Sequence, residues 1–109
     1  MTRTTLPPPV DGFLDAINRN DTAAFLAHFP QDGVVDDWGT RYVGHARIKA
    51  WSEREFIGVQ VRLTVTGVEQ SGNEISITAQ VGGNGFTGPS RFVMVVDGAQ
   101  IREMRISAH

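Results

Sequence analysis

Two adjacent aspartates, Asp36 and Asp37, are the side chains of this sequence best placed for acid–base chemistry. They lie in Val34 to Trp38, a short β-rich segment followed by a glycine, so we expect a strand there. Strands disfavour acidic residues unless these are exposed or serve a function. Because adjacent strand residues point to opposite faces, the two carboxylates cannot form one joint acid–base site. Either one of them faces a pocket, and the spacing does not say which, or both lie at a hydrated strand end.

Large aromatic side chains lie close to this pair in the sequence. Trp38, Tyr42 and Trp51 are amphipathic rings, and a ring beside a carboxylate suits a flat apolar ligand. The alternative for each tryptophan is that it fills the core. His45, just before an expected helix, is either a general base near neutral pH or a surface side chain at the helix entry.

Composition and spacing argue against several classes of function. The chain of 109 residues carries 10 basic and 12 acidic side chains, a net charge of −2, so no basic excess supports nucleic-acid binding. With no cysteines and three scattered histidines we expect no metal site. Gly83 to Gly88 matches G-x-G-x-x-G, but Pro89 and a β-pattern follow where a nucleotide site needs a helix. We therefore expect a flexible loop there and no cofactor.

The chain is expected to be a single domain over residues 10–109, after a lead-in over residues 1–9. No run of roughly 18 apolar residues occurs, and Met1 to Leu6 has no apolar run. We therefore expect no membrane segment, no signal peptide and a cytoplasmic location. The charged residues Lys49 and Glu53 to Glu55 are typical of a solvated helix face, so no chemistry is assigned to them.

The elements that must position these residues follow from periodicity. Apolar residues at helical spacing predict a helix over Val10 to Arg19, and Asn20 or Asp21 can cap a second short helix that Pro30 ends. A third helix is expected over about Ala46 to Phe56.

Beyond the third helix the period changes to two. Val59 to Thr66 and Glu74 to Val81 each alternate apolar and polar residues, followed by Arg91 to Val96, the turn Asp97-Gly98 and a last strand ending near Ser107. The sequence therefore predicts an α+β fold, with three N-terminal helices packed on one face of a curved antiparallel β-sheet.

This order of elements resembles the nuclear transport factor 2-like superfamily, and within it the SnoaL-like and ketosteroid isomerase-like domains. The resemblance covers nearly the whole chain, and four stretches carry it: Phe13 to Phe29, Val34 to Asp37, Gly44 to Ile48, and Met104-Arg105. It implies a cystatin-like cone, a homodimer, and a small apolar or aromatic ligand.

The resemblance also implies roles for individual residues. Asp37 takes the position of the catalytic general base, whereas the two positions that hold oxyanion donors in the isomerase carry Phe13 and Phe92. The implied lining of an apolar, cone-shaped pocket is Phe13, Ile17, Val35, Asp37, Trp51, Phe56, Leu63, Phe92, Met94 and Met104, with Trp38 and Tyr42 as further ligand-binding candidates.

The sequence leaves two functions open. One is a small-molecule enzyme of isomerase or cyclase type, in which Asp37 abstracts a proton beside a carbonyl group. The other is a non-catalytic ligand-binding or dimerisation module, which the loss of both oxyanion donors favours. A protein-interaction domain fits less well, because the outer faces of the two long strands are polar.

Overall fold

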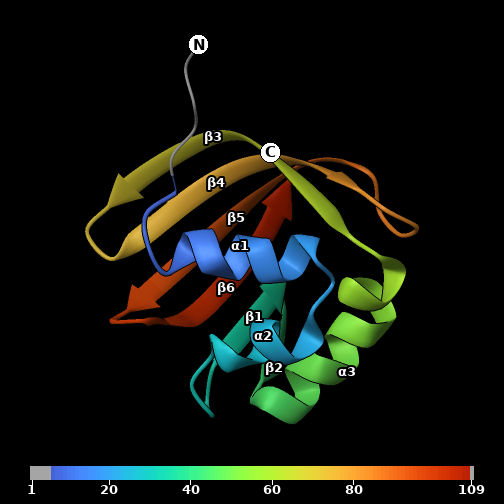
Figure 1. Cartoon of the computed structure of the whole chain (residues 1–109), viewed down its shortest axis with the longest axis horizontal. Helices are drawn as coiled ribbons and strands as arrows, with labels where there is room; N and C mark the ends of the chain where they lie inside the picture. Colours follow the sequence, from blue (N-terminus) through green and yellow to red (C-terminus); the bar gives the residue numbers. More distant parts are fainter. Residues whose placement is uncertain (1–5, 109) are drawn as a thin grey trace.

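The computed structural model describes residues 6–108; residues 1–5 of the expected lead-in, and His109, lie outside the described residues. Three helices and a 3-10 turn pack against one six-stranded sheet (Figure 1). The elements, in chain order, are α1 Val10–Asn18, α2 Thr22–Ala27, β1 Val34–Asp37, β2 Thr40–Val43, α3 His45–Glu55, the 3-10 helix η1 Ile57–Val59, β3 Arg62–Ser71, β4 Glu74–Gly82, β5 Gly88–Asp97 and β6 Gln100–Ala108. The predicted α+β class is confirmed.

The helices form where the sequence predicts them. In α1 the apolar stripe that includes Phe13 and Ile17 is fully buried. The α2 N-cap is Asp21, whose side chain accepts a hydrogen bond from the Ala24 amide at 3.0 Å. The third helix ends at Glu55, and η1 follows it directly.

The sheet has the strand order β2-β1-β6-β5-β4-β3. All neighbouring strands are antiparallel except β1 and β6, which are parallel, so the expectation of a purely antiparallel sheet is wrong at this one pairing. No hairpin joins these two strands, which lie far apart in the chain, so no turn signal could indicate their relative direction. Parallel pairing brings the C-terminal end of β1 to the C-terminal end of β6.

The long strands show the predicted alternation and carry a bend. In β4, Ile75, Ile77 and Ala79 are buried, whereas the residues between them are partly exposed. A register shift between Val65 and Gly67 of β3 marks a bulge, and bulges increase the local twist of a strand. The strand predicted from Val59 begins instead at Arg62, because η1 occupies the first residues of that segment.

Two asparagines attach α1 to β3, the edge strand of the sheet. The Leu63 amide donates to Asn18 Oδ1 at 2.7 Å, and Asn18 Nδ2 donates to the Leu63 carbonyl at 3.0 Å. Asn20 Nδ2 donates to the carbonyl of Val61 at 3.1 Å. These bonds occupy backbone groups at the edge of β3 and fix the start of this strand against the helices.

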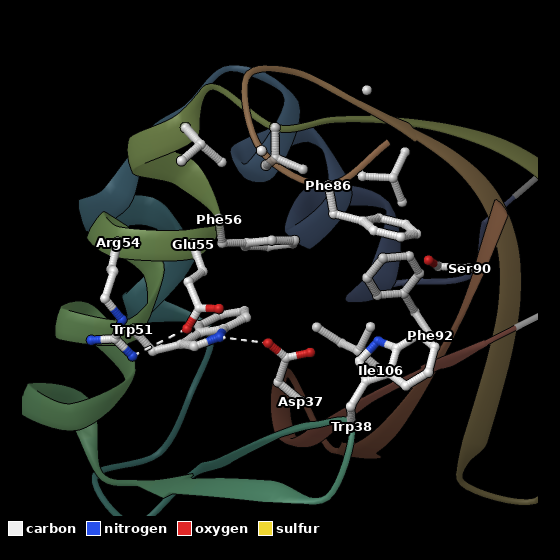
Figure 2. A pocket seen from close by; sticks show the side chains of 15 residues that line it. Asp37, Trp38, Trp51, Arg54, Glu55, Phe56, Phe86, Ser90, Phe92 and Ile106 are labelled. Carbon is white, nitrogen blue, oxygen red and sulfur yellow. Dashed lines mark hydrogen bonds and ion pairs between the residues drawn. The ribbon is translucent and has the colours of Figure 1, made fainter. Parts of the chain in front are cut away.

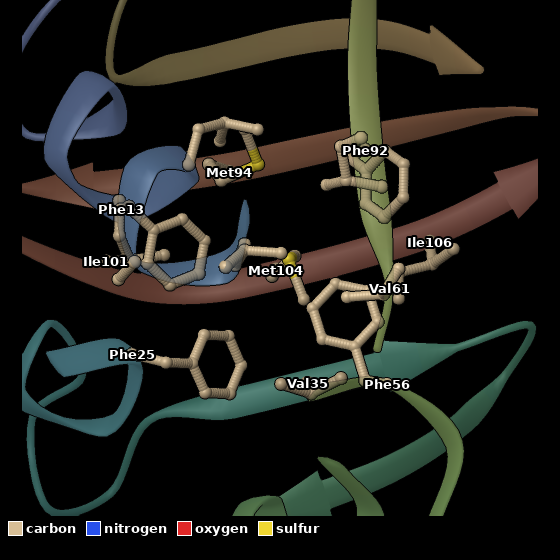
Figure 3. Packing of buried hydrophobic residues seen from close by; sticks show 14 of the residues in the cluster. Phe13, Phe25, Val35, Phe56, Val61, Phe92, Met94, Ile101, Met104 and Ile106 are labelled. Atoms are coloured by element: carbon tan, nitrogen blue, oxygen red, sulfur yellow. The ribbon is translucent and has the colours of Figure 1, made fainter. Parts of the chain in front are cut away.

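The core lies between the helices and the sheet (Figure 3). Phe13 stacks on Phe25 with ring centroids 5.4 Å apart and meets Phe29 edge-on at the same distance. Met94 and Met104 are fully buried on neighbouring strands. These side chains pack against one another, and the cavity described below lies at one end of the sheet.

Candidate functional site

A cavity of about 230 Å³ opens at one end of the sheet (Figure 2). Its walls come from the C-terminal ends of β1, β4 and β6, the N-terminal half of β5, the C-terminal end of α3, η1, the residue just before β3 and the loop between β4 and β5. The lining residues are Asp37, Trp38, Trp51, Arg54, Glu55, Phe56, Val59, Val61, Val81, Gly82, Gly85, Phe86, Ser90, Phe92 and Ile106.

Strand register separates the two adjacent aspartates. Asp37 pairs with Ile106 of β6 and lines the cavity. Asp36 is not among the lining residues: its Oδ1 accepts a hydrogen bond from the Gly39 amide at 2.8 Å, and its Oδ2 lies 3.9 Å from Arg41 Nη1. The geometry thus assigns a turn-stabilising contact to Asp36 and an inward position to Asp37.

One hydrogen bond orients the Asp37 carboxylate. Trp51 Nε1 donates to Asp37 Oδ2 at 3.0 Å, and the Trp51 side chain is only 1% exposed. The indole is itself held by stacking on Phe56, with ring centroids 4.9 Å apart. Among residues 6–108, no lysine, arginine or histidine nitrogen lies within 4.0 Å of this carboxylate. The charge of Asp37 therefore faces the cavity without a cationic partner in the described part of the chain.

The strand predicted over Val34 to Trp38 is one residue too long, because Trp38 directly follows the strand and does not belong to it. Strand β1 ends at Asp37, and Trp38 has a left-handed backbone with φ of 53°, followed by Gly39 with φ of 93°. The Trp38 amide donates to the carbonyl of Ile106 at 3.0 Å, which closes the end of the β1–β6 pairing. The ring lines the cavity and is 62% exposed.

The structure distributes the predicted ligand-binding residues over two regions. Trp38, Trp51, Phe56 and Phe92 line the cavity together with Asp37. Tyr42 is half-buried beside the cavity, 6.0 Å from Trp51 between ring centroids. His45 lies outside the lining, with Nε2 at 2.9 Å from the carbonyl of Phe29. The remaining predicted residues are packed in the core away from this cavity: Phe13, Ile17, Val35, Leu63, Met94 and Met104.

The sequence did not indicate several of the residues that line the cavity. Arg54 and Glu55, assigned there to a solvated helix face, lie at the cavity and pair with each other at 3.2 Å. Phe86 belongs to the glycine-rich loop and is 59% exposed. Ser90 is 1% exposed, and its position two residues before Phe92 on the same face of β5 was the available signal.

In the part of the chain that the structure describes, no group of three or more His, Cys, Asp or Glu side chains could hold a metal ion. No helix among the described residues is long and apolar enough to cross a membrane.

Solved structures with this fold include proteins from three bacteria. A candidate polyketide cyclase from Sinorhizobium meliloti superposes with a TM-score of 0.81 at 24% identity, covering 94% of this chain and 95% of that one. A protein of ketosteroid isomerase-like fold from Catenulispora acidiphila, in complex with trimethylamine, gives 0.79 at 22% identity, covering 94% and 86%. A Mycobacterium tuberculosis protein in complex with estradiol-17beta-hemisuccinate gives 0.75 at 15% identity, covering 92% and 90%.

At these identities the structural likeness shows the fold alone. A search of curated proteins finds no match. The family model of the SnoaL-like domain matches residues 10–109, which is nearly the whole chain. The chain therefore belongs to the SnoaL-like domain family, within the nuclear transport factor 2-like superfamily.

Proposed function

We propose that this protein is a small-molecule enzyme of isomerase or cyclase type in which Asp37 is the general base. The observation that carries the proposal is a carboxylate that lines an otherwise largely apolar cavity, oriented by Trp51 Nε1 at 3.0 Å and without a cationic partner among the described residues. A carboxylate held in this way can accept a proton from a bound molecule that approaches its free oxygen.

The proposed chemistry begins at a carbon beside a carbonyl group. Asp37 accepts the proton of that carbon, the C–H electron pair forms the enolate double bond, and the carbonyl oxygen becomes negatively charged. In an isomerisation, protonated Asp37 returns the proton to a different carbon. In a cyclisation, the enolate carbon attacks a second carbonyl group of the same molecule, and the new alkoxide takes the proton from Asp37.

An enolate oxygen needs hydrogen-bond donors, and these contribute much of the catalysis in such reactions. Phe92 supplies no hydrogen-bond donor at its position, because its ring is apolar. The lining does contain two other groups that can donate, the buried Ser90 hydroxyl and the Arg54 guanidinium. Figure 2 shows Ser90 and Arg54 on opposite sides of the cavity, and the Arg54 guanidinium is paired with Glu55 at 3.2 Å, so we assign binding of the enolate oxygen to the Ser90 hydroxyl.

The ligand is proposed to be a small apolar or aromatic carbonyl compound. The five aromatic side chains among the lining residues support an apolar ring system. The M. tuberculosis protein of the same fold was solved in complex with estradiol-17beta-hemisuccinate, so a protein of this fold can bind a rigid polycyclic molecule.

A second candidate function is a non-catalytic ligand-binding or dimerisation module. The observation that favours it is the pair of phenylalanines at the two positions that the resemblance gives to oxyanion donors: Phe92 faces the cavity as an apolar ring, and Phe13 is buried in the core. Such a module would bind the same ligands without moving a proton.

The test measures proton transfer directly. Ketones, steroids, aromatic polyketides and fatty acids are first screened by thermal shift, because a ligand that binds only the folded state raises its Tm. Each carbonyl compound that binds is then incubated in D₂O, and deuterium incorporation beside the carbonyl is followed by NMR. We expect the wild type to catalyse exchange and Asp37→Asn to lose roughly 100-fold or more of the rate.

Asp36→Asn is the matched control, since it makes the same chemical change one residue away on the other face of the strand. It should keep the exchange rate of the wild type. Exchange that survives in Asp37→Asn would rule out Asp37 as the base. Saturable binding without exchange in any variant would support the binding module instead, and size-exclusion chromatography with light scattering would test the predicted homodimer.

A further inference from the structure

We propose that the mouth of this cavity is a second part of the ligand site, at which the rings of Trp38 and Phe86 cover a planar conjugated ligand that extends beyond the cavity. This inference rests on the proposed ligand site, and it adds two specificity-determining residues: Trp38 and Phe86 favour ligands with at least two fused rings, bound with the outer ring at the mouth.

The first observation is where the exposed apolar side chains lie. The large hydrophobic side chains that are exposed among residues 6–108 are Trp38, Val43 and Phe86. Trp38 at 62% and Phe86 at 59% exposure both line the same cavity, although they come from different loops. Figure 2 shows them on the same side of the cavity as Phe92, opposite Trp51 and Phe56. The cavity thus has an aromatic wall on each side, and one of these walls continues into solvent.

The second observation is that neither local conformation nor core packing accounts for a tryptophan at position 38. The two-residue turn Trp38-Gly39 joins β1 to β2, and both residues have positive φ, which is the backbone of a type I′ turn. Asn-Gly is the preferred sequence there, and a bulky side chain in the left-handed region costs free energy. The ring recovers little of this cost by burial, because most of it is exposed. A residue that adopts an unfavourable backbone conformation without gaining stability from burial is typical of a functional position.

The third observation is that the loop carrying Phe86 is held at a defined place. The Asn84 amide donates to the carbonyl of Val59 at 2.8 Å, and a side chain at Gly85 would come within 2.9 Å of Val59. The loop base is therefore packed closely on η1. Gly88, with φ of 138°, passes the Phe86 ring so closely that an added Cβ would lie 3.3 Å from it. These contacts hold the Phe86 side chain over the cavity.

Size and charge at the mouth then select the ligand. The cavity volume of about 230 Å³ is below the roughly 300–1,000 Å³ that is usual for sites that enclose a drug-sized molecule. A fused-ring compound with its reactive carbon near Asp37 must therefore reach the mouth. Planar rings stack on aromatic side chains, and the nearby Arg54–Glu55 pair adds no net charge that would favour an ion.

The experiment compares ligands of increasing length on matched variants. Cyclohex-2-enone, 1-tetralone and anthrone carry one, two and three fused rings, and their affinities are measured by isothermal titration calorimetry. Trp38→Asn installs the preferred turn sequence, so it should raise the Tm of the free protein by a few degrees. The same change should weaken the affinity for anthrone by roughly five- to tenfold, which is the usual contribution of one aromatic contact. It should leave the affinity for cyclohex-2-enone unchanged.

Phe86→Ser provides a second, independent variant with the same expected loss for anthrone. Val43→Thr is the control, because Val43 is an exposed hydrophobic side chain, 49% accessible, that does not line the cavity. It should change neither Tm nor affinity appreciably.

Three results would overturn the inference. The first is an anthrone affinity that is unchanged in both Trp38→Asn and Phe86→Ser, or no binding of any fused-ring compound to the wild type. The second is a lower Tm in Trp38→Asn, which would show that the ring is kept for stability. The third is a wild-type dimer that both variants convert to monomer with ligand binding intact, because the rings would then cover a second copy of the chain. If the wild type bound these compounds but catalysed no proton exchange, the proposed role of Asp37 would be contradicted, whereas the inference about the mouth of the cavity would not be affected.

Discussion

The hydrogen bond from Trp51 to Asp37 can be measured as a free energy of unfolding. Trp51→Phe keeps an aromatic ring in a site that is 1% exposed but removes the N–H that donates at 3.0 Å. A hydrogen bond to a charged acceptor contributes about 1.5–3 kcal/mol, and the space left by the smaller ring costs about 1 kcal/mol more. With an unfolding entropy of about 0.23 kcal/mol/K for a chain of this length, a loss of about 2.5–4 kcal/mol lowers Tm by about 11–17 °C.

A double-mutant cycle separates the charged part of this bond from the packing loss. Asp37→Asn keeps an oxygen acceptor for Trp51 but removes the negative charge, so the bond becomes an ordinary neutral one worth about 1 kcal/mol. Trp51→Phe should therefore cost about 1 kcal/mol less in the Asp37→Asn background than in the wild type. Urea unfolding followed by circular dichroism measures all four proteins and does not depend on the fluorescence of Trp51.

The same cycle with Asp36→Asn is the control and should show no coupling, because Asp36 contacts the turn and not Trp51. The reasoning would be refuted if Trp51→Phe cost the same, within about 0.3–0.5 kcal/mol, in the wild type and in Asp37→Asn. In that case Trp51 would not hold an ionised Asp37, and the proposed orientation of the base would lose its support.

Two further predictions concern the frame that positions the cavity. Asn18→Ala removes both side-chain bonds to Leu63 and should lower the free energy of unfolding by about 1–3 kcal/mol, with faster amide hydrogen exchange at Leu63; Asn18→Asp keeps the acceptor but turns a second oxygen toward the Leu63 carbonyl, so it should also destabilise the fold. An unchanged exchange rate at Leu63 would show that these bonds do not hold the edge of β3. Gly58→Ala should be far more damaging, with a loss of about 4 kcal/mol or more in thermal unfolding, because the added Cβ would lie 1.7 Å from the carbonyl oxygen of Glu53. Gly98→Ala, where nothing lies within 4 Å but φ is +61°, should cost only about 1–2 kcal/mol, and the reverse order of the two would contradict this explanation.

Features that depend on neighbouring residues were predictable from the sequence. The helical spacing of Phe13 and Ile17 predicted the buried face of α1. A helix cap was predicted at Asn20 or Asp21, and Asp21 is the N-cap in the structure. The alternation in β4 predicted which of its faces is buried. These features follow from the geometry of a single helix, strand or turn, which neighbouring residues largely determine.

Part of the candidate site was also predictable. The sequence and its resemblance singled out Asp37, Trp51 and Phe56, which the structure brings together at one cavity. They did not indicate Ser90 or Phe86, and they included Met94 and Met104, which fill the core. A sequence pattern marks a side chain as inward-facing, but it does not show whether the space in front of that side chain is filled by other residues or left open.

The spacing of the residues did not decide which of the two adjacent carboxylates faces the cavity; the tertiary structure did. Spacing alone left Asp36 and Asp37 equivalent, and the parallel register of β1 against β6 sets Asp37 opposite Ile106, at the sheet end where the cavity opens. An antiparallel pairing would have carried the same residue toward the opposite end of β6. The sequence by itself determined the helices, the strands and their buried faces, because these depend on local periodicity. The location of the open space, and the carboxylate that faces it, depended on a pairing between strands that are distant in the chain and are joined by no turn.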